Sequence, residues 1–307
     1  MATRSSLSTI AAGGMLLFFF GSVYASEQWR VCAAEGAAGL CDFIGDNSIQ
    51  KAVNIAKDGD SIVLAPGLYT PRSTQDIPLN ELLIRGYVVV SGKDLSIYGE
   101  DGAIISGVNG APSCALLIHN STVNISNLKI QNFKYDIEED DIYDGHGVFI
   151  INSKVRIDSI KFSYIQKMAL SSHGNSFVEA TRLQILDSHI GVWTNDNSRV
   201  SIRDSRLSRN DSAGIAAYQH SRVKMENSLL EYSEDDGVYA ADHAELTILT
   251  STIINNKPIG IHADKDSKIS IDTSYVADNE TNYSSAMAGK GVVSIGTDMR
   301  LHTSDTL

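Results

Sequence analysis

Short stretches in which apolar and polar residues alternate fill the chain from Gly147 onward, with Asn, Asp, Ser and Gly between them. Within residues 191–213 these stretches are Val192-Trp193-Thr194, Val200-Ser201-Ile202 and Ser205-Arg206-Leu207. Alternation with a period of two predicts half-buried strands, and the polar residues between them predict turns. No part of these repeats keeps a 3.6-residue period for long enough to predict a helix.

These strands recur at a fixed interval. A step from a small residue to a hydrophobic one returns every 22 or 23 residues, at Gly147-Val148, Ala169-Leu170, Gly191-Val192, Gly214-Ile215, Gly237-Val238 and Gly260-Ile261. A second landmark keeps the same register, at Ser153, Ser176, Ser198, Ser221, Ala244 and Ser267. A period of this length predicts a stacked solenoid, and three strands per period predict a parallel β-helix. A leucine-rich repeat would need a leucine scaffold that is absent, and a propeller blade would need roughly 40 residues.

Aliphatic residues occupy the positions predicted to face the interior, including Val148, Ile150, Val155, Ile157, Ile160 and Phe162. Short polar residues occupy the turn after the second strand, at Asn127, Asp158, Asp204 and Asn227. Such side chains tolerate left-handed backbone and hydrogen-bond to local peptide groups. We therefore expect a continuous apolar core and a ladder of polar side chains at this turn.

Both ends of the solenoid depart from the repeat. Residues 48–70 fit an opening segment, in which Asn47 or Asp46 caps a short helix that ends at Gly59 and has apolar residues Ile49, Val53 and Ala56. The segment 60–64 is predicted as the first strand, and the helix is expected to cover the open end of the core. At the other end, Gly291-Val292 follows Gly260 after 31 residues, so residues 283–290 are interpreted as an insertion.

The first 25 residues resemble a signal peptide. Arg4 precedes an apolar run over residues 10–20, and Val23-Tyr24-Ala25 fits a cleavage site. This run is short for a membrane span, so we expect a secreted or periplasmic protein, with an uncleaved anchor as the alternative. Secretion in turn favours a disulfide between Cys32 and Cys41, whereas Cys114 lies in an apolar strand and is expected to be a buried free thiol.

The net charge of −12 limits the partners of this 307-residue chain. Nucleic acid is excluded by repulsion, and an anionic polymer would need a bridging cation such as calcium. Neutral or cationic sugars meet no such barrier.

The repeat pattern resembles the right-handed parallel β-helix superfamily, which includes pectate lyases, polygalacturonases and alginate epimerases. The resemblance covers nearly all of residues 26–307, with a cap over 26–59 and the most regular repeats over 147–282. It implies an all-β, single-stranded, right-handed β-helix of about nine to ten coils with a short N-terminal capping helix. Among such proteins the strand that begins at the glycine step lines the substrate groove.

Outward positions of that strand carry aromatic and polar side chains. Neighbouring coils stand about 4.8 Å apart, so one patch is expected from His173, Trp193, Asn195, Tyr218 and Tyr239. Aromatic rings cover the apolar face of a pyranose and polar groups take its hydroxyls, which favours glycan binding by Trp193, Asn195, Tyr218 and Tyr239. The alternative is that these rings stack only on one another and stiffen the sheet.

An insertion of about ten residues, 133–144, precedes the first regular repeat. It carries hard oxygen ligands suited to calcium, namely Glu138, Glu139, Asp140 and Asp141. The spacing matches no EF-hand, and a solvated acidic loop is the alternative.

The insertion ends in Tyr143-Asp144-Gly145-His146-Gly147. The last three residues are similar to a polygalacturonase motif, although the Asp235-Asp236 pair comes after it and no Arg-Ile-Lys follows. Asp144-x-His146 is similar to an alginate epimerase motif without its proline. The resemblance implies lyase or epimerase chemistry, with Asp144, His146 and His173 as acid and base and calcium or Arg199 as a neutraliser of the sugar carboxylate. A non-catalytic surface module that binds glycan or protein is the alternative.

Overall fold

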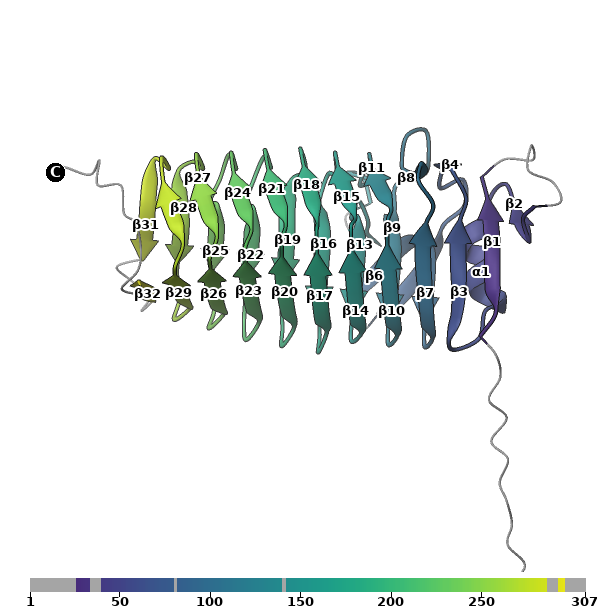
Figure 1. The fold of residues 1–307 in the computed structure, drawn as a ribbon, viewed down its shortest axis with the longest axis horizontal. Helices are drawn as coiled ribbons and strands as arrows, with labels where there is room; N and C mark the ends of the chain where they lie inside the picture. Colours follow the sequence, from purple (N-terminus) through teal and green to yellow (C-terminus); the bar gives the residue numbers. More distant parts are fainter. Residues whose placement is uncertain (1–25, 34–39, 80–81, 140–141, 286–291, 296–307) are drawn as a thin grey trace, which may run out of the picture.

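The protein is a parallel β-helix in a computed structural model that describes residues 26–33, 40–79, 82–139, 142–285 and 292–295 (Figure 1). Three long sheets, here called A, B and C, wrap one continuous hydrophobic core. All strand pairs in the described residues are parallel except the antiparallel pair β5–β6. The all-β, right-handed fold predicted from the sequence is confirmed.

Sheet A contains twelve strands: β1 (Gln28–Cys32), β2 (Phe43–Ile44), β3 (Asp60–Leu64), β7 (Asp94–Gly99), β10 (Thr122–Ser126), β14 (Lys154–Asp158), β17 (Phe177–Thr181), β20 (Arg199–Arg203), β23 (Arg222–Glu226), β26 (Glu245–Leu249), β29 (Lys268–Asp272) and β32 (Val292–Ile295). Sheet B contains nine: β4 (Gly67–Tyr69), β8 (Ala103–Ser106), β11 (Lys129–Gln131), β15 (Lys161–Ser163), β18 (Gln184–Leu186), β21 (Arg206–Ser208), β24 (Leu229–Glu231), β27 (Thr252–Ile254) and β30 (Tyr275–Ala277).

Sheet C contains the strands at the glycine step of the regular repeats, together with strands from the coils before and after them. They are β5 (Gln75–Leu79), β6 (Leu82–Ser91), β9 (Cys114–His119), β12 (Ile142–Tyr143), β13 (Val148–Ile151), β16 (Met168–His173), β19 (Ile190–Thr194), β22 (Ile215–Ala217), β25 (Val238–Ala240), β28 (Ile259–Ala263) and β31 (Thr281–Ser285). Each coil contributes one strand to each sheet in turn, so equivalent residues of successive coils lie side by side.

The close approach of neighbouring coils explains the repeated glycines. A Cβ atom on Gly191 would lie 2.4 Å from the carbonyl oxygen of Gly214, and one on Gly237 would lie 2.6 Å from that of Gly260. Such contacts are far inside van der Waals distance, so a side chain would push the coils apart. The hydrophobic residue after each step then pairs with its counterpart, as Val148, Leu170, Val192, Ile215, Val238 and Ile261 do.

Buried polar side chains link the coils at the turns. Ser228 Oγ accepts a hydrogen bond from the Ser205 peptide N–H at 3.1 Å, and Ser251 Oγ accepts one from Ser228 at 3.2 Å. Asn256 and Asn279 form a second ladder, in which Asn256 Oδ1 accepts from the Ser233 N–H at 2.9 Å. These bonds satisfy peptide groups that the strands leave unpaired.

The predicted ladder after the second strand needs one correction. Left-handed backbone occurs at Asn127, Asp204 and Asn227, with φ between 47° and 54°, and Asn227 Nδ2 donates to Asp204 Oδ1 at 2.5 Å. Asp158, however, ends strand β14, and the left-handed residue of that coil is Ser159.

The N-terminal segment differs from the prediction in two respects. Strands β1 and β2 precede β3, so residues 60–64 are the third strand and not the first. Helix α1 (Ser48–Ile55) packs its apolar face into the core, but Asn47 makes no side-chain cap and adopts φ 58°. The helix ends before Gly59, which lies in the following turn with φ 90°.

The predicted C-terminal insertion is wrong. Tyr283 pairs with Ile261 in sheet C, so the coil keeps its usual length there although Asn282 stands where glycine is expected. Val292 pairs with Lys268 in sheet A and opens no new strand of sheet C. Glycine spacing missed this coil because the residue before the hydrophobic position had changed.

Cys32 and Cys41 form a disulfide, and Cys114 is a free, fully buried thiol. Burial raises the pKa of Cys114 to about 12, so the thiol is not ionised near neutral pH. The proposed signal peptide, residues 1–25, lies outside the described residues. Within the described part of the chain, no helix has the length and apolar character to span a membrane.

Candidate functional site

The outer face of sheet C carries the aromatic column that the sequence predicted. Its first column runs across neighbouring strands through Phe149, Ser171, Trp193, Ala216, Tyr239 and His262, in the predicted register. The column is not uniformly accessible, because Phe149, Ser171 and Ala216 are buried on this face whereas Trp193, Tyr239 and His262 are half-buried.

Three neighbouring rings, each tilted relative to the next, form what we call the aromatic ladder. The ring centroids of Trp193 and Tyr218 are 4.4 Å apart, and those of Tyr218 and Tyr239 are 5.5 Å apart. Ala216 pairs directly with Trp193 and has a small side chain. The space above it is open to the ring of Tyr218, which lies two residues further along the chain. Trp193, Tyr218 and Tyr239 therefore lie together as predicted, on the surface of one sheet.

The ladder continues into a histidine and an aspartate. The His262 ring lies 5.1 Å from the Tyr239 ring in an edge-on arrangement. His262 Nδ1 lies 2.7 Å from Asp236 Oδ2, whereas Asp236 Oδ1 is buried and has no hydrogen-bond partner among the described residues. Tyr239 also donates its hydroxyl to Asp264 Oδ2 at 3.4 Å. The Asp236 carboxyl and the His262 imidazole thus lie in contact at the Tyr239 end of the aromatic ladder.

The electrostatic environment at this end is acidic. Burial raises the pKa of Asp236, while the hydrogen bond from His262 opposes that rise. Burial, together with Asp264, raises the pKa of Tyr239 to about 12. Burial and the neighbouring Asp235 also raise the pKa of Tyr218. Each of these shifts favours the neutral form, so the site disfavours additional negative charge.

Asn195 lies beside the ladder, two residues after Trp193 and just past the end of β19. Its peptide N–H donates to the Ser172 carbonyl at 2.9 Å, and its side chain is half-buried. The Asn195 Oδ1 atom is buried without a hydrogen-bond partner in the described residues.

Asp144, His146 and His173, which were predicted as acid and base, lie apart from the aromatic ladder. Asp144 is 0% exposed and His146 is 2% exposed, so neither reaches the surface in this structure. Both ring nitrogens of His146 are buried without partners among the described residues, and its ring packs edge-on against Phe149 at 5.2 Å. Burial lowers the pKa of His146 well below its usual value and raises that of Asp144.

His173 lies next to this buried group and is itself half-buried. It stacks on Phe149 with ring centroids 4.6 Å apart, and its Nε2 lies 2.7 Å from Ser171 Oγ. Burial lowers the pKa of His173 to about 4. Asp144 and His146 are thus buried, whereas His173 is half-buried, and their role as acid and base stays a prediction.

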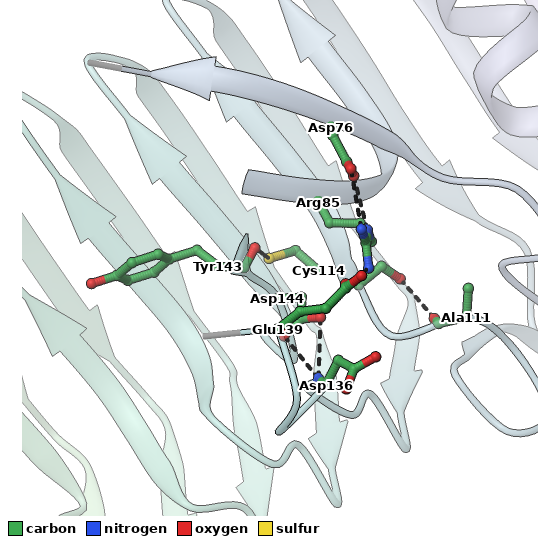
Figure 2. A network of polar contacts seen from close by, with 9 residues as sticks. Asp76, Arg85, Ala111, Cys114, Asp136, Glu139, Tyr143 and Asp144 are labelled. Atoms are coloured by element: carbon green, nitrogen blue, oxygen red, sulfur yellow. Dashed lines mark hydrogen bonds and ion pairs between the residues drawn. The ribbon is translucent and has the colours of Figure 1, made fainter. Parts of the chain in front are cut away.

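Figure 2 shows how the insertion is held against the sheet. Strand β12 pairs with the first half of β6, and Arg85 of β6 bridges Asp76 at 2.8 Å and Glu139 at 2.6 Å. The Asp136 peptide N–H donates to both carboxylate oxygens of Asp144 at 3.3 and 3.2 Å. Polar contacts thus fix the loop on both sides of its acidic segment.

These contacts bear on the predicted calcium site. Glu139 faces Arg85, Glu138 is exposed, and Asp140 and Asp141 lie outside the described residues. In the described parts of the chain, no three or more His, Cys, Asp and Glu side chains gather in a way that would hold a metal ion. Arg199, which the sequence offered as a neutraliser beside these residues, belongs to sheet A and faces a different side of the solenoid.

Sequence reasoning missed Asp236, His262 and Asp264 as members of one site. His262 follows Tyr239 in the same column of sheet C, and Asp264 lies two residues later, so the 23-residue period is the signal that could have found them. Asp236 precedes the glycine step of the coil before His262, so its contact depends on the stacking of two coils.

The fold is shared with solved structures of low sequence identity. An alginate lyase from Paenibacillus sp. str. FPU-7 is 14% identical, with 90% of this chain and 100% of that chain covered and a TM-score of 0.56. A rhamnogalacturonan lyase is 10% identical, with 88% and 87% covered and a TM-score of 0.54. At these identities the likeness concerns the fold alone.

Comparison with curated proteins found no match to this chain. A protein-family model described as the right handed beta helix region, in contrast, matches residues 113–281. That segment spans the aromatic ladder, the Asp236–His262 pair and the regular coils beneath them. The chain therefore belongs to the right-handed β-helix family.

Proposed function

We propose that this protein binds a polysaccharide along the outer face of sheet C. The observation that carries the proposal is the aromatic ladder, in which Trp193, Tyr218 and Tyr239 present adjacent, half-buried rings on one face. Rings held by a sheet lose little conformational freedom on binding and match the apolar faces of sugar rings. Asn195 supplies an amide beside them for sugar hydroxyls.

The charge around the ladder selects among polysaccharides. Asp235, Asp236, Asp242 and Asp264 all contribute to raising the pKa values of the two tyrosines after burial, the largest cause. A carboxylated sugar placed here would add a further negative charge to this group. The polymer bound at sheet C is therefore neutral or cationic, such as one containing amino sugars.

The same proposal includes a location outside the cytoplasm. The apolar run near the N-terminus and the Cys32–Cys41 disulfide both support a secreted or periplasmic protein.

Calorimetric titration with a panel of neutral glucans, galactans and chitosan oligosaccharides tests the binding site. We expect Trp193→Ala to weaken binding of the preferred polymer by about tenfold or more, since a tryptophan ring commonly contributes most to such a surface. Tyr275→Ala, which removes a half-buried tyrosine from sheet B, is the matched control and keeps wild-type affinity. Unchanged affinity in a folded Trp193→Ala protein would mean that the rings only stiffen the sheet.

A second candidate function is acid–base catalysis at the end of the ladder. It is favoured by the 2.7 Å contact between Asp236 and His262, which fixes the orientation of the imidazole and leaves Nε2 as the other ring nitrogen for a proton transfer. Product analysis separates this from binding alone. If the site is catalytic, wild-type protein releases new reducing ends, and His262→Ala stops that release while polymer is still bound.

A further inference from the structure

The outer face of sheet A concentrates positive charge in an acidic protein. Strands β14, β17, β20 and β23 carry six basic side chains, all exposed, namely Lys154, Arg156, Arg199, Arg203, Arg222 and Lys224. The same four strands carry three acidic ones, at Asp158, Glu179 and Glu226. Since the whole chain has a net charge of −12, this face has the opposite sign to the molecule as a whole.

Register places an aromatic ring within this basic face. Phe177 pairs with Lys154 on one side and Arg199 on the other, and Arg199 pairs in turn with Arg222. The Phe177 side chain is 39% exposed, which is high for a large apolar residue. Like charges placed directly opposite each other on neighbouring strands destabilise a sheet, so the Arg199–Arg222 pair is unfavourable by itself.

Only part of this charge is neutralised within the protein. Arg156 pairs with Glu179 at 2.8 Å, Arg222 with Glu245 at 2.9 Å and Lys224 with Glu226 at 2.7 Å. In the part of the chain that the structure describes, neither Arg199 nor Lys154 takes part in an ion pair. The guanidinium beside the exposed ring is therefore available to a ligand.

A groove of about 260 Å³ lies at the same place. It runs over β17, β20, β23 and β26, and its lining includes Phe177, Arg199, Arg222, Lys224, Glu245 and Thr247. The lining thus combines an aromatic ring with three basic groups and one carboxylate. We call it the sheet A groove.

We propose that the sheet A groove binds a carboxylated sugar of an acidic polysaccharide. The Phe177 ring lies against the apolar face of the sugar, and the planar Arg199 guanidinium takes its carboxylate through two parallel hydrogen bonds. The exposed Phe177 ring and the Arg199–Arg222 pair are each unfavourable in the free protein. A bound carboxylated sugar would cover the ring and neutralise part of the charge. The site lies on another sheet from the aromatic ladder, so it extends the function proposed above and does not depend on it.

The ligand must contact both the Phe177 ring and the basic side chains of the sheet A groove. A small anion such as inorganic phosphate would use the arginines and leave Phe177 exposed. A carboxylated sugar offers an apolar ring face to Phe177 and a carboxylate to the basic groups, so it uses both parts of the groove.

Calorimetric titration with polygalacturonate oligosaccharides tests the proposal, with their methyl esters as uncharged counterparts. We expect wild-type protein to bind the acid and not the ester, with affinity falling as salt increases. Arg199→Ala and Phe177→Ala each weaken binding by about tenfold. Arg199→Lys recovers part of the loss, because a lysine restores the charge without the planar pair of donors.

Lys268→Ala is the matched control, because it removes one exposed charge from the same row of sheet A beyond the groove. It should change affinity less than twofold, an effect on the order of the screened interaction of distant surface charges. Equal losses in Lys268→Ala and Arg199→Ala would overturn the proposal in favour of general charge attraction. Equal competition by inorganic phosphate or by single-stranded polynucleotide would also overturn it.

The proposals for the aromatic ladder and for the sheet A groove can be disproved independently. Trp193→Ala should leave polygalacturonate binding unchanged, and Arg199→Ala should leave binding of the neutral or cationic polymer unchanged. Since sheets A and C lie on different sides of the core, saturation with one polymer should not displace the other. Loss of both activities in either variant, with the fold intact, would contradict the assignment of separate sites.

Discussion

Asp236 and His262 meet across two successive coils, with Oδ2 of the carboxyl 2.7 Å from Nδ1 of the imidazole. Asp236 lies just before the start of β25 and His262 lies within β28, so the contact exists only when the coils stack. The Asp236 carboxyl is buried and its Oδ1 has no partner among the described residues. One hydrogen bond therefore opposes the effect of burial on the pKa of this acid.

We expect His262→Phe to raise the pKa of Asp236 further. Burial raises that pKa, whereas the hydrogen bond and the charge of His262 lower it, so removal of the imidazole leaves burial without its main opposition. NMR titration of the Asp236 carboxyl carbon measures the shift. His243→Phe, which changes an exposed histidine at a turn, is the control. An unchanged Asp236 titration in His262→Phe would show that the two groups are not coupled.

Stability should fall as the pH drops from about 6.5 to about 4, because of His173. Burial lowers the pKa of His173 from 6.5 to about 4, so within this window the unfolded chain binds a proton that the folded protein does not. The shift corresponds to roughly 3 kcal/mol at the acid end of the window. Urea unfolding at pH 7 and pH 4.5 measures it. His173→Phe, which can still stack on Phe149, should show a smaller loss, and an identical loss would contradict the prediction.

Asp144→Asn should stabilise the protein at neutral pH. Burial raises the pKa of Asp144, so the wild-type protein loses stability as the pH rises from about 3.8 through the folded-state pKa and this carboxyl ionises. An amide keeps an oxygen that accepts from the Asp136 N–H and carries no charge. Unfolding free energies at pH 7 and pH 3 should show a gain at pH 7 and almost none at pH 3. Glu138→Gln, on the exposed part of the same loop, is the comparison, and a gain of equal size there would disprove the effect of burial.

Asn256→Ala should lower the free energy of unfolding by about 2–3 kcal/mol, the loss expected when several buried groups lose their partners. Asn256 is fully buried, accepts from the Ser233 N–H at 2.9 Å and donates to Asn279 Oδ1 at 2.9 Å. Denaturant unfolding measures the change. Asn197→Ala, at an exposed turn position, should alter stability only slightly. A loss of similar size at both positions would mean that the ladder contributes little.

Glycine spacing was a sound guide to register where the coils approach closely, as at Gly191 and Gly237. It failed at Tyr283, where Asn282 replaces glycine and the coil nevertheless continues. The N-terminal strands β1 and β2 also went unpredicted, because they precede the regular repeats and share no period with them. Local pattern thus identified the repeating unit better than the two ends.

In the candidate site, too, residues of the regular repeats were predictable and residues of the insertion were not. Trp193, Tyr218 and Tyr239 were predictable because a fixed period converts positions in the sequence into neighbours on a sheet. Burial of Asp144 and His146 was not, because it depends on how a non-repeating insertion packs through β12, Arg85 and Asp136. The sheet A groove was not predicted, because the family resemblance places substrate binding on the strands at the glycine step, which form sheet C.

The sequence by itself determined the repeating coil, the core columns and the face on which each side chain of a regular strand lies. It could do so because alternation and a constant period are local properties of the chain. Only the tertiary structure decided which polar groups are accessible, that Asp236 meets His262, and that Arg199 stands beside the exposed Phe177. Accessibility and charge pairing depend on what covers or faces a side chain across coils, and no stretch of sequence contains that information.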